Sequence, residues 1–556
     1  MPKAIKIKTT LLALALLLLI SLPTFARMLR YGIYPMHDFH TFRLYEFDKC
    51  IKDKIFPCRW APDSGFGYGE PLFNFYPQLP YAIGEIFILS GFAVVTSTKI
   101  TFILSLFLSS ISMFALVLFI TKNKFSAILA STLYLYAPYR AVDVWVRGAL
   151  PESLAFILYP LCVLFFEQHL ESGKLKHLIF LSFSLAALFL THNLSFMMFI
   201  MLFIPWILLR TRAEKKAKVL PGLLLTFLLS LAISSFQLFP IIAEMKMINI
   251  QQTTEGYYDF RAHFVTLRQL FISKAFGFGA SVWGPDDNIS FSLGHLHWII
   301  SIMSLVFAVR VKSKTKKLIV LSLALALISA LLTHNKSTFI YLLSPILPQL
   351  QFPWRWLAPG AFFFSLAGGF LPLFIKNTKV VILLMAAVVG WNFTFFRPDY
   401  WLAISDEEIF SGGRFEEQKA SAVNDFWPKF GNATPISTAP SNPLIISGEG
   451  IIRNYSRSSH SSLATIDISR NQTTIQFPTV YFPGWKVFTD TRREVTIRPD
   501  PYLGLIEVTL DKGIHQLQLT LTNTLPRSLG NLVSLSSLTL ALYLLNKCKI
   551  HERQSY

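Results

Sequence analysis

The segment Met36-His37-Asp38-Phe39-His40-Thr41-Phe42-Arg43 lies in the loop after the first long apolar stretch of the chain, residues 10–27. It places an acidic residue between histidine and arginine at the mouth of a hydrophobic helix. A charge close to hydrocarbon costs free energy, so such a residue tends to be kept where it has a function. Asp38 is therefore the first candidate for chemistry.

Three further polar clusters follow other apolar stretches on what we predict to be the same face of the membrane. Taken singly, each has an ordinary interpretation as a residue group that anchors a helix end at the interface. Four clusters on one face, with none comparable on the other, favour an outward-facing site. The three are Arg140/Asp143/Arg147/Glu152, His192 with His334, and Arg355 within Phe352-Pro353-Trp354-Arg355-Trp356.

One carboxylate with several arginines and histidines suits transfer from a phosphorylated lipid. Arginine binds phosphate or pyrophosphate, and a carboxylate can take the proton of an incoming hydroxyl. We expect Asp38 to be the catalytic base. Asp38 with His40 could also ligate a divalent metal, but two groups do not make a site, so a cofactor stays open. The predicted donor-phosphate ligands are Arg43, Arg140, Arg147 and Arg355, supported by His37, His40, Asp143, Glu152, His192 and His334.

The composition is that of a membrane protein, with 53% hydrophobic and 15% charged residues and a mean hydropathy of +0.48. Soluble domains carry nearer ~25% charged residues. Twelve apolar stretches approach the ~20 residues that cross a bilayer as helix. The fold class predicted is a polytopic α-helical membrane protein of about twelve spans. The stretches are 10–27, 98–121, 125–139, 153–169, 177–191, 194–209, 219–243, 291–309, 318–332, 357–375, 378–396 and 528–546.

Charge gives the orientation. With a cytoplasmic N-terminus, the inside segments hold 22 of the 51 Lys and Arg residues and three of the 32 Asp and Glu residues. The remainder, 29 of each sign, balances, so the net charge of +19 is a topology signal and not one of nucleic-acid binding. We predict a cell (inner) membrane protein with both termini cytoplasmic. Residues 79–97 would then lie on the outer surface or re-enter, and a signal peptide over 1–26 is the alternative at the N-terminus.

Three parts are predicted: a transmembrane domain over 1–396 with outer loops 28–97, 140–152 and 244–290, an extracytoplasmic β-rich module over 397–526, and a last helix with a cytoplasmic tail over 527–556. Alternating segments such as 505–510 and 517–521 predict antiparallel strands in a β-sandwich. In the module, Trp485 either stacks on a glycan or packs in the core. Cys50 and Cys58 either pair or remain free thiols.

The chain resembles the GT-C superfamily of lipid-phosphate-sugar-dependent glycosyltransferases. This resemblance rests on Asp38, the acid of the first loop, on the helix count and on the segment Tyr76-Pro77-Gln78-Leu79-Pro80-Tyr81. More narrowly, the chain resembles bacterial membrane proteins named as pyruvoyl-tetrahydropterin-synthase-related. This resemblance rests on residues 137–140, 146–152, 190–193 and 351–355. Residues 481–487 and 513–515 resemble the C-terminal module of YfhO-type proteins. Nothing resembles the metal site of a soluble pterin enzyme. The GT-C resemblance assigns the role of base or metal ligand to Asp38, although the family's common doubled acid is here His37-Asp38-Phe39.

The resemblance implies an inverting glycosyltransferase that takes a sugar from a polyprenyl-phosphate donor on the outer face of the membrane. Its acceptor would be a cell-envelope glycan, a lipid-linked polymer or a protein, and membrane lipid would be a further partner. A transporter or flippase for lipid-linked saccharides is the rival, although its polar residues should lie in broken helices at mid-membrane. A non-catalytic envelope-assembly protein is a third possibility, because a fold does not fix a function.

Overall fold

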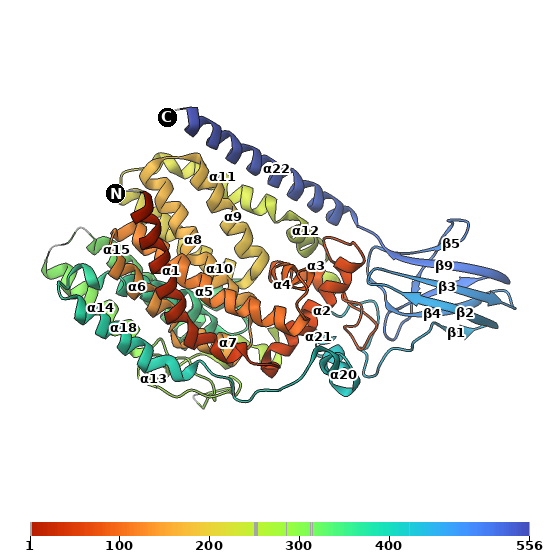
Figure 1. Ribbon diagram of the computed structural model, residues 1–556. Coiled ribbons are helices and arrows are strands. Elements are labelled where there is room, and N and C mark those ends of the chain that lie inside the picture. The colour runs from red at the N-terminus through yellow and green to blue at the C-terminus, as the bar shows by residue number, and fades with distance from the viewer. Residues whose placement is uncertain are drawn as a thin grey trace.

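A computed structural model of the protein describes residues 3–249, 254–284, 286–311, 313, 315–421 and 423–554. Figure 1 shows a helical bundle with a β-rich module projecting from one end. The helix α1 begins, and α22 ends, at the opposite end of the bundle. Lys312 and Lys314, two of the residues that suggested the orientation, lie outside the described residues.

Each of the twelve predicted apolar stretches contains helix in the structure. Seven helices are long and apolar enough to cross a membrane, or up to nine if each of two sharply bent pairs counts as one span. The predicted count of about twelve spans is not confirmed, because the other predicted stretches correspond to shorter apolar helices. The apolar helices are α1 (Lys3–Phe25), α5 (Val94–Thr121), α6 (Lys124–Leu135), α8 (Leu150–Ser172), α9 (Leu175–Thr191), α10 (Asn193–Ala213), α11 (Leu220–Ile233), α12 (Ser235–Glu244), α14 (His295–Arg310), α15 (Lys316–Leu332), α17 (Leu357–Gly368), α18 (Thr378–Asn392) and α22 (Leu525–Gln554).

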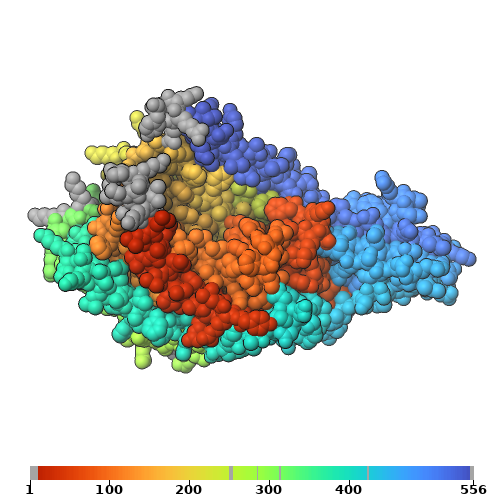
Figure 2. Space-filling view, viewed as in Figure 1, coloured from red at the N-terminus to blue at the C-terminus, as the bar shows by residue number. Residues whose placement is uncertain are grey.

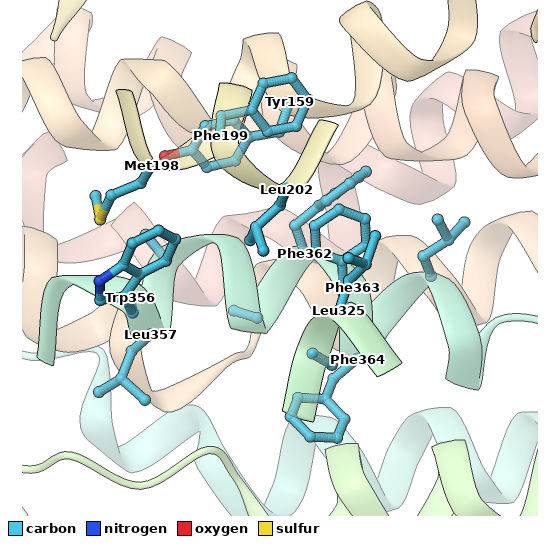
Figure 3. Close-up of a cluster of buried hydrophobic side chains, with 14 of the residues drawn as sticks. Tyr159, Met198, Phe199, Leu202, Leu325, Trp356, Leu357, Phe362, Phe363 and Phe364 are labelled. Atoms are coloured by element: carbon cyan, nitrogen blue, oxygen red, sulfur yellow. The ribbon is translucent and has the colours of Figure 1, made fainter. Parts of the chain in front are cut away.

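Apolar and aromatic side chains hold the bundle together. Tyr159 and Phe199 stack with ring centroids 5.0 Å apart, and Phe362 and Phe363 pack beside them (Figure 3). Trp356 is fully buried in this core. Offset and edge-to-face ring pairs of this kind stabilise a core by about 0.5–1.5 kcal/mol beyond the area that they bury.

Short helices accompany the long apolar helices of the bundle. The predicted outer or re-entrant stretch 79–97 divides between α4 and the start of α5, which begins at Val94. The α2 helix buries the charged residues Arg43, Glu46 and Asp48, and Arg414 of the linker between the bundle and the module pairs with its first residue. These elements are η2 (Pro35–His37), α2 (Asp38–Lys52), α3 (Leu72–Phe75), α4 (Leu79–Leu89), α7 (Pro138–Trp145), α13 (Leu267–Phe271), α16 (Thr338–Leu343), α19 (Asp406–Ile409), α20 (Gly412–Ala420) and α21 (Val423–Phe426).

The C-terminal module consists of two antiparallel sheets, ordered β1-β4-β8-β7 and β2-β3-β9-β5-β6. Inward residues of both sheets, such as Ile466 and Val508, belong to one apolar core. The strands are β1 (Leu444–Ser447), β2 (Gly450–Arg457), β3 (Ser461–Ile468), β4 (Thr473–Val480), β5 (Trp485–Thr489), β6 (Glu494–Val495), β7 (Arg498–Pro499), β8 (Leu505–Leu510) and β9 (Gly513–Leu521).

The first loop completes the core of this module. Trp60, Tyr68 and Phe75 belong to the same apolar cluster as the sheets, and the module adjoins the first loop in the space-filling view (Figure 2). Trp485 is 6% exposed and packs edge to face on Trp60, with ring centroids 5.3 Å apart. The predicted glycan-stacking role of Trp485 is therefore wrong, because its ring faces the interior. Cys50 and Cys58 form a disulfide within this loop.

Candidate active site

Asp38 is the first residue of α2, directly after the short helix η2. Arg414 of α20 donates from Nε to its Oδ2 at 2.9 Å, and Nη2 binds the same oxygen. The other oxygen, Oδ1, is buried and has no hydrogen-bond partner among the described residues. Burial raises the pKa of Asp38, and Arg414 opposes this rise. One carboxylate oxygen is thus held in place while the other remains able to accept a proton.

Arg43 lies further along the same helix and is 2% exposed. Its guanidinium is sandwiched between the rings of Phe39 and Tyr76, 3.8 and 3.9 Å from their centroids. Nε and Nη1 are buried without a hydrogen-bond partner in the described part of the chain. Buried polar groups are nearly always hydrogen-bonded, so unpaired guanidinium nitrogens suggest a site for an anionic ligand.

Two carboxyl groups near Arg43 were missed by the sequence analysis. Glu70 is fully buried, and neither of its oxygens has a partner in the described residues. Burial raises the pKa of Glu70 to about 8, although the charge of Arg43 lowers it. Burial also raises the pKa of Asp425, again against Arg43. The Gly-rich aromatic context of Glu70 was a signal that could have been used, whereas nothing local distinguishes Asp425.

Arg147 organises a second group of charges. Its Nη1 lies 2.6 Å from Glu152 Oε2 and 3.1 Å from Asp143 Oδ1. It also donates to the Tyr139 hydroxyl at 3.0 Å, and its guanidinium lies over the ring of Trp354. Burial, with the charge of Glu152, raises the pKa of Asp143 well above its ordinary value, against the effect of Arg147. One arginine therefore balances two carboxyl groups.

The electrostatic environment of two histidines shows that these groups adjoin. Burial holds the pKa of His40 well below its ordinary value, and the charges of Arg43, His192 and Arg147 lower it further. Burial likewise lowers the pKa of His192 to about 4, with Glu152 opposing and Arg355 and Arg147 adding to the effect. The first loop, residues 139–152, the α9–α10 turn and Arg355 thus form a single polar cluster, which we call the outer cluster.

Arg355 keeps hydrogen-bonding capacity within the outer cluster. Its Nη1 donates to the Leu350 carbonyl at 2.8 Å and to Gln351 Oε1 at 3.1 Å. Its Nε is buried without a partner among the described residues. His37, by contrast, has a packing role: it bonds the Val144 carbonyl at 3.0 Å and stacks on Phe102.

Two predicted site residues have other roles. Arg140 is fully buried and donates to the Ser153 carbonyl at 3.0 Å and the Ser105 carbonyl at 3.2 Å. These bonds join α5 to α8, so the phosphate-binding role predicted for Arg140 is replaced by a structural one. His334 caps the short helix η8 (Asn335–Ser337), where it accepts the Lys336 backbone N–H at 3.2 Å.

The repeated Leu-Thr-His-Asn sequence has a structural explanation. His192 caps α10 by accepting the backbone N–H of Ser195 at 3.3 Å, just as His334 caps η8. A side-chain acceptor at this position satisfies a backbone donor that the helix cannot. The repeat thus marks two helix starts, and only His192 takes part in the outer cluster.

The residues present do not form a metal site around Asp38. In the described part of the chain, the one group of three His, Cys, Asp or Glu side chains at ligand distance is Cys50, Cys58 and His460. Those cysteines are joined as a disulfide. Asp38 faces Arg414, and His40 Nδ1 lies 2.9 Å from the Tyr81 hydroxyl. We therefore derive no step through a metal.

Residues 73–398 match the model of a membrane-protein family described as the 6-pyruvoyl-tetrahydropterin synthase related domain. The chain belongs to this family. The match spans α4 to α18 and the part of the outer cluster formed by residues 139–152, the α9–α10 turn and Arg355, whereas Asp38 and Arg43 precede it and Arg414 follows it. The predicted resemblance to the pyruvoyl-tetrahydropterin-synthase-related group is thereby confirmed.

No curated protein matches the chain. Among solved structures, the chain is similar to the cryo-EM structure of arabinofuranosyltransferase AftD from Mycobacteria, with a TM-score of 0.42 and 13% identity. The match covers 72% of this chain and 28% of that one, so the chain corresponds to little more than a quarter of the mycobacterial protein.

Proposed function

We propose that this 6-pyruvoyl-tetrahydropterin synthase related protein is a membrane glycosyltransferase that takes a sugar from a polyprenyl-phosphate donor. The acceptor would be a cell-envelope glycan, lipid-linked polymer or protein on the outer face. The observation that carries the proposal is the outer cluster, which combines a carboxylate that has a free, buried oxygen with an arginine that has unpartnered nitrogens.

The proposed reaction is a single displacement. The acceptor hydroxyl attacks the anomeric carbon of the donor sugar, and its proton passes to Oδ1 of Asp38. The bond between the anomeric carbon and the phosphate oxygen breaks, and its electron pair leaves with the lipid phosphate. Arg43 and Arg355 would hold that phosphate as its charge develops, which lowers the barrier. Attack from the face opposite the leaving group inverts the anomeric configuration.

Arg414 acts in this scheme as a positioning residue. It binds Oδ2 of Asp38, so it fixes the direction of Oδ1, and it opposes the rise in the Asp38 pKa that burial causes. A base must be ionised to accept a proton, and its pKa should lie near the working pH. Arg414 was missed by sequence analysis because it is 376 residues from its partner.

The test is transfer by the purified full-length protein from radiolabelled polyprenyl-phosphate sugars to envelope extracts. Asp38→Asn keeps the volume and removes the basicity, so turnover per folded molecule should fall by about 10²–10⁴-fold. Arg414→Gln should instead shift the pH profile upward, because the Asp38 pKa then rises further. Glu255→Gln, an exposed acid on another outer loop, is the control and should change nothing. Normal turnover in Asp38→Asn would move the base elsewhere, with Asp143 or Glu152 next.

The bent helices favour one rival function. The segments Ala217–Ile233 and Ser235–Met247 meet at 74°, and Lys316–Leu332 and Asn335–Leu343 meet at 89°. Broken helices are typical of transporters and can line a path for a substrate. Movement of a labelled lipid-linked saccharide across reconstituted vesicles, unchanged in Asp38→Asn and without sugar transfer, would favour a flippase over the transferase.

A further inference from the structure

A pocket of about 300 Å³ lies where the first loop, the linker and the β-module meet. This volume is at the lower end of the ~300–1,000 Å³ typical of small-molecule sites. Lys419, on its wall, follows Arg414 by five residues on α20, a separation of about 8 Å along a helix axis. The pocket is thus separate from Asp38, which does not line it. Its walls include Asp63, Phe66, Lys419, Thr438, Tyr455 and Arg457.

Hydrogen bonds between the three segments form the walls in advance. The backbone N–H of Phe66 donates to the Lys419 carbonyl at 3.0 Å, and the Phe66 carbonyl accepts from the Ala439 N–H at 2.9 Å. Arg457 of the module donates to the Gly67 and Pro62 carbonyls at 2.5 and 2.8 Å.

Phe66 itself adopts a φ of +58°, a left-handed conformation that is uncommon for a bulky residue. Such a conformation persists where the surrounding structure over-determines it, and it recurs at ligand clamps. The hydrogen bonds on both sides of Phe66 supply that constraint. The pocket is therefore a built feature of three segments and not a gap between loosely placed loops.

The charged side chains around the pocket are all engaged with partners within the protein. Asp63 pairs with Lys49, and Lys419 pairs with Glu416 at 2.7 Å. The Arg457 guanidinium binds backbone carbonyls. An ionic ligand would have to displace one of these partners, whereas a neutral, hydroxyl-rich ligand can share their remaining hydrogen-bonding capacity.

The remaining wall suits a sugar ring. Phe66, Tyr455, Pro440 and Pro478 contribute flat apolar surfaces, and the Tyr455 hydroxyl has no hydrogen-bond partner among the described residues. A pyranose or furanose ring has an apolar C–H face and a hydroxyl edge. Aromatic residues with one polar end match such a ligand.

We propose that this pocket binds a neutral saccharide unit. That the saccharide belongs to the acceptor rests on the proposed transferase function, and in that case the pocket presents the hydroxyl beyond this unit to Asp38. The β-module would then contribute to acceptor choice through Tyr455 and Arg457, which face the first loop, and not through the buried Trp485.

The test blocks the pocket with a large side chain introduced at an exposed residue of its wall. Ser441 is an exposed wall residue, whereas its exposed neighbour Asn442 is not part of the wall. Binding of neutral pentose and hexose trisaccharides, and of a uronic-acid trisaccharide, would be measured by saturation-transfer NMR on the full-length protein in nanodiscs. We expect a neutral trisaccharide to bind, Ser441→Trp to weaken this binding by about tenfold or more, and the matched control Asn442→Trp to leave it unchanged. Equal thermal unfolding of the two variants confirms that both are folded.

The outcomes separate the pocket from the transferase. Saccharide binding that Ser441→Trp abolishes, in a protein without transfer activity, would support the pocket and overturn the transferase. Transfer with an unchanged acceptor KM in Ser441→Trp would overturn the pocket and leave the transferase standing, since a lost binding contact should raise KM with kcat unchanged. No binding of any neutral trisaccharide, or binding of the uronic-acid probe alone, would also overturn the pocket.

Discussion

Two buried arginines, Arg527 and Arg43, have opposite surroundings. Arg527 and Glu244 are 1% and 3% exposed and pair at 2.9 Å. Both oxygens of Glu244 are bonded, one to Thr524 at 2.5 Å and the other also to Asn74 at 2.7 Å. This pair joins α12, the start of α22 and the first loop. Every charged group in it has partners within the protein.

Arg43 is equally buried, but two of its nitrogens and both oxygens of nearby Glu70 lack partners in the described residues. A buried ion pair whose hydrogen bonds are all made within the protein has a structural role, because removal of one partner leaves the other charge buried and uncompensated. A buried charge without partners costs folding free energy unless a ligand completes it. The difference assigns a structural role to the Glu244 pair and a ligand-binding role to the outer cluster.

The same substitution at both arginines tests this comparison. Arg527→Met should destabilise the protein by about 3–5 kcal/mol, because Glu244 is left buried and unpaired. Thermal unfolding in one detergent would measure the loss. Arg527→Met combined with Glu244→Leu should recover much of it, and a single variant as stable as the wild type would contradict the structural role.

Arg43→Met should affect activity more than stability. It removes two cation–π contacts, which contribute about 0.5–2 kcal/mol each, and it relieves the cost of burying a charge, so unfolding should change little. Loss of a charge-assisted hydrogen bond to phosphate should weaken donor binding by about tenfold or more. Donor KM, measured beside thermal unfolding, separates the two effects. A large drop in stability with a normal KM would place Arg43 in the same class as Arg527.

Glu70 should give the smallest effect, a change in the pH dependence of stability. Its pKa rises from 4.5 to about 8 in the folded protein. Between these values the unfolded chain releases a proton that the folded protein retains, so stability is fully present below pH 4.5 and is lost as the pH rises to about 8. The loss amounts to at most about 1.4 kcal/mol per pH unit.

Glu70→Gln should flatten this part of the stability profile, as measured by unfolding at several pH values. Burial also raises the pKa of Glu46 to about 8, so some slope should remain. Glu407→Gln, at an exposed position, is the matched control. An unchanged profile in Glu70→Gln would mean that Glu70 is ionised, and therefore compensated, in the folded protein.

The sequence by itself determined the membrane class, the positions of the apolar helices, the alternating strands of the module and the candidacy of Asp38, Arg43, Arg147 and His192. These features depend on local properties, namely the transfer free energy of a run of residues, the side-chain period of a strand, and charge at a helix end. Only the tertiary structure separated Arg140, whose guanidinium joins α5 to α8, from Arg147 in the outer cluster. It alone paired Arg414 with Asp38 and placed Glu70 and Asp425 beside Arg43. It also turned Trp485 inward against Trp60. The hydrogen-bond partner of a side chain and its burial depend on which distant segments of the chain pack together. A local sequence pattern does not contain that information.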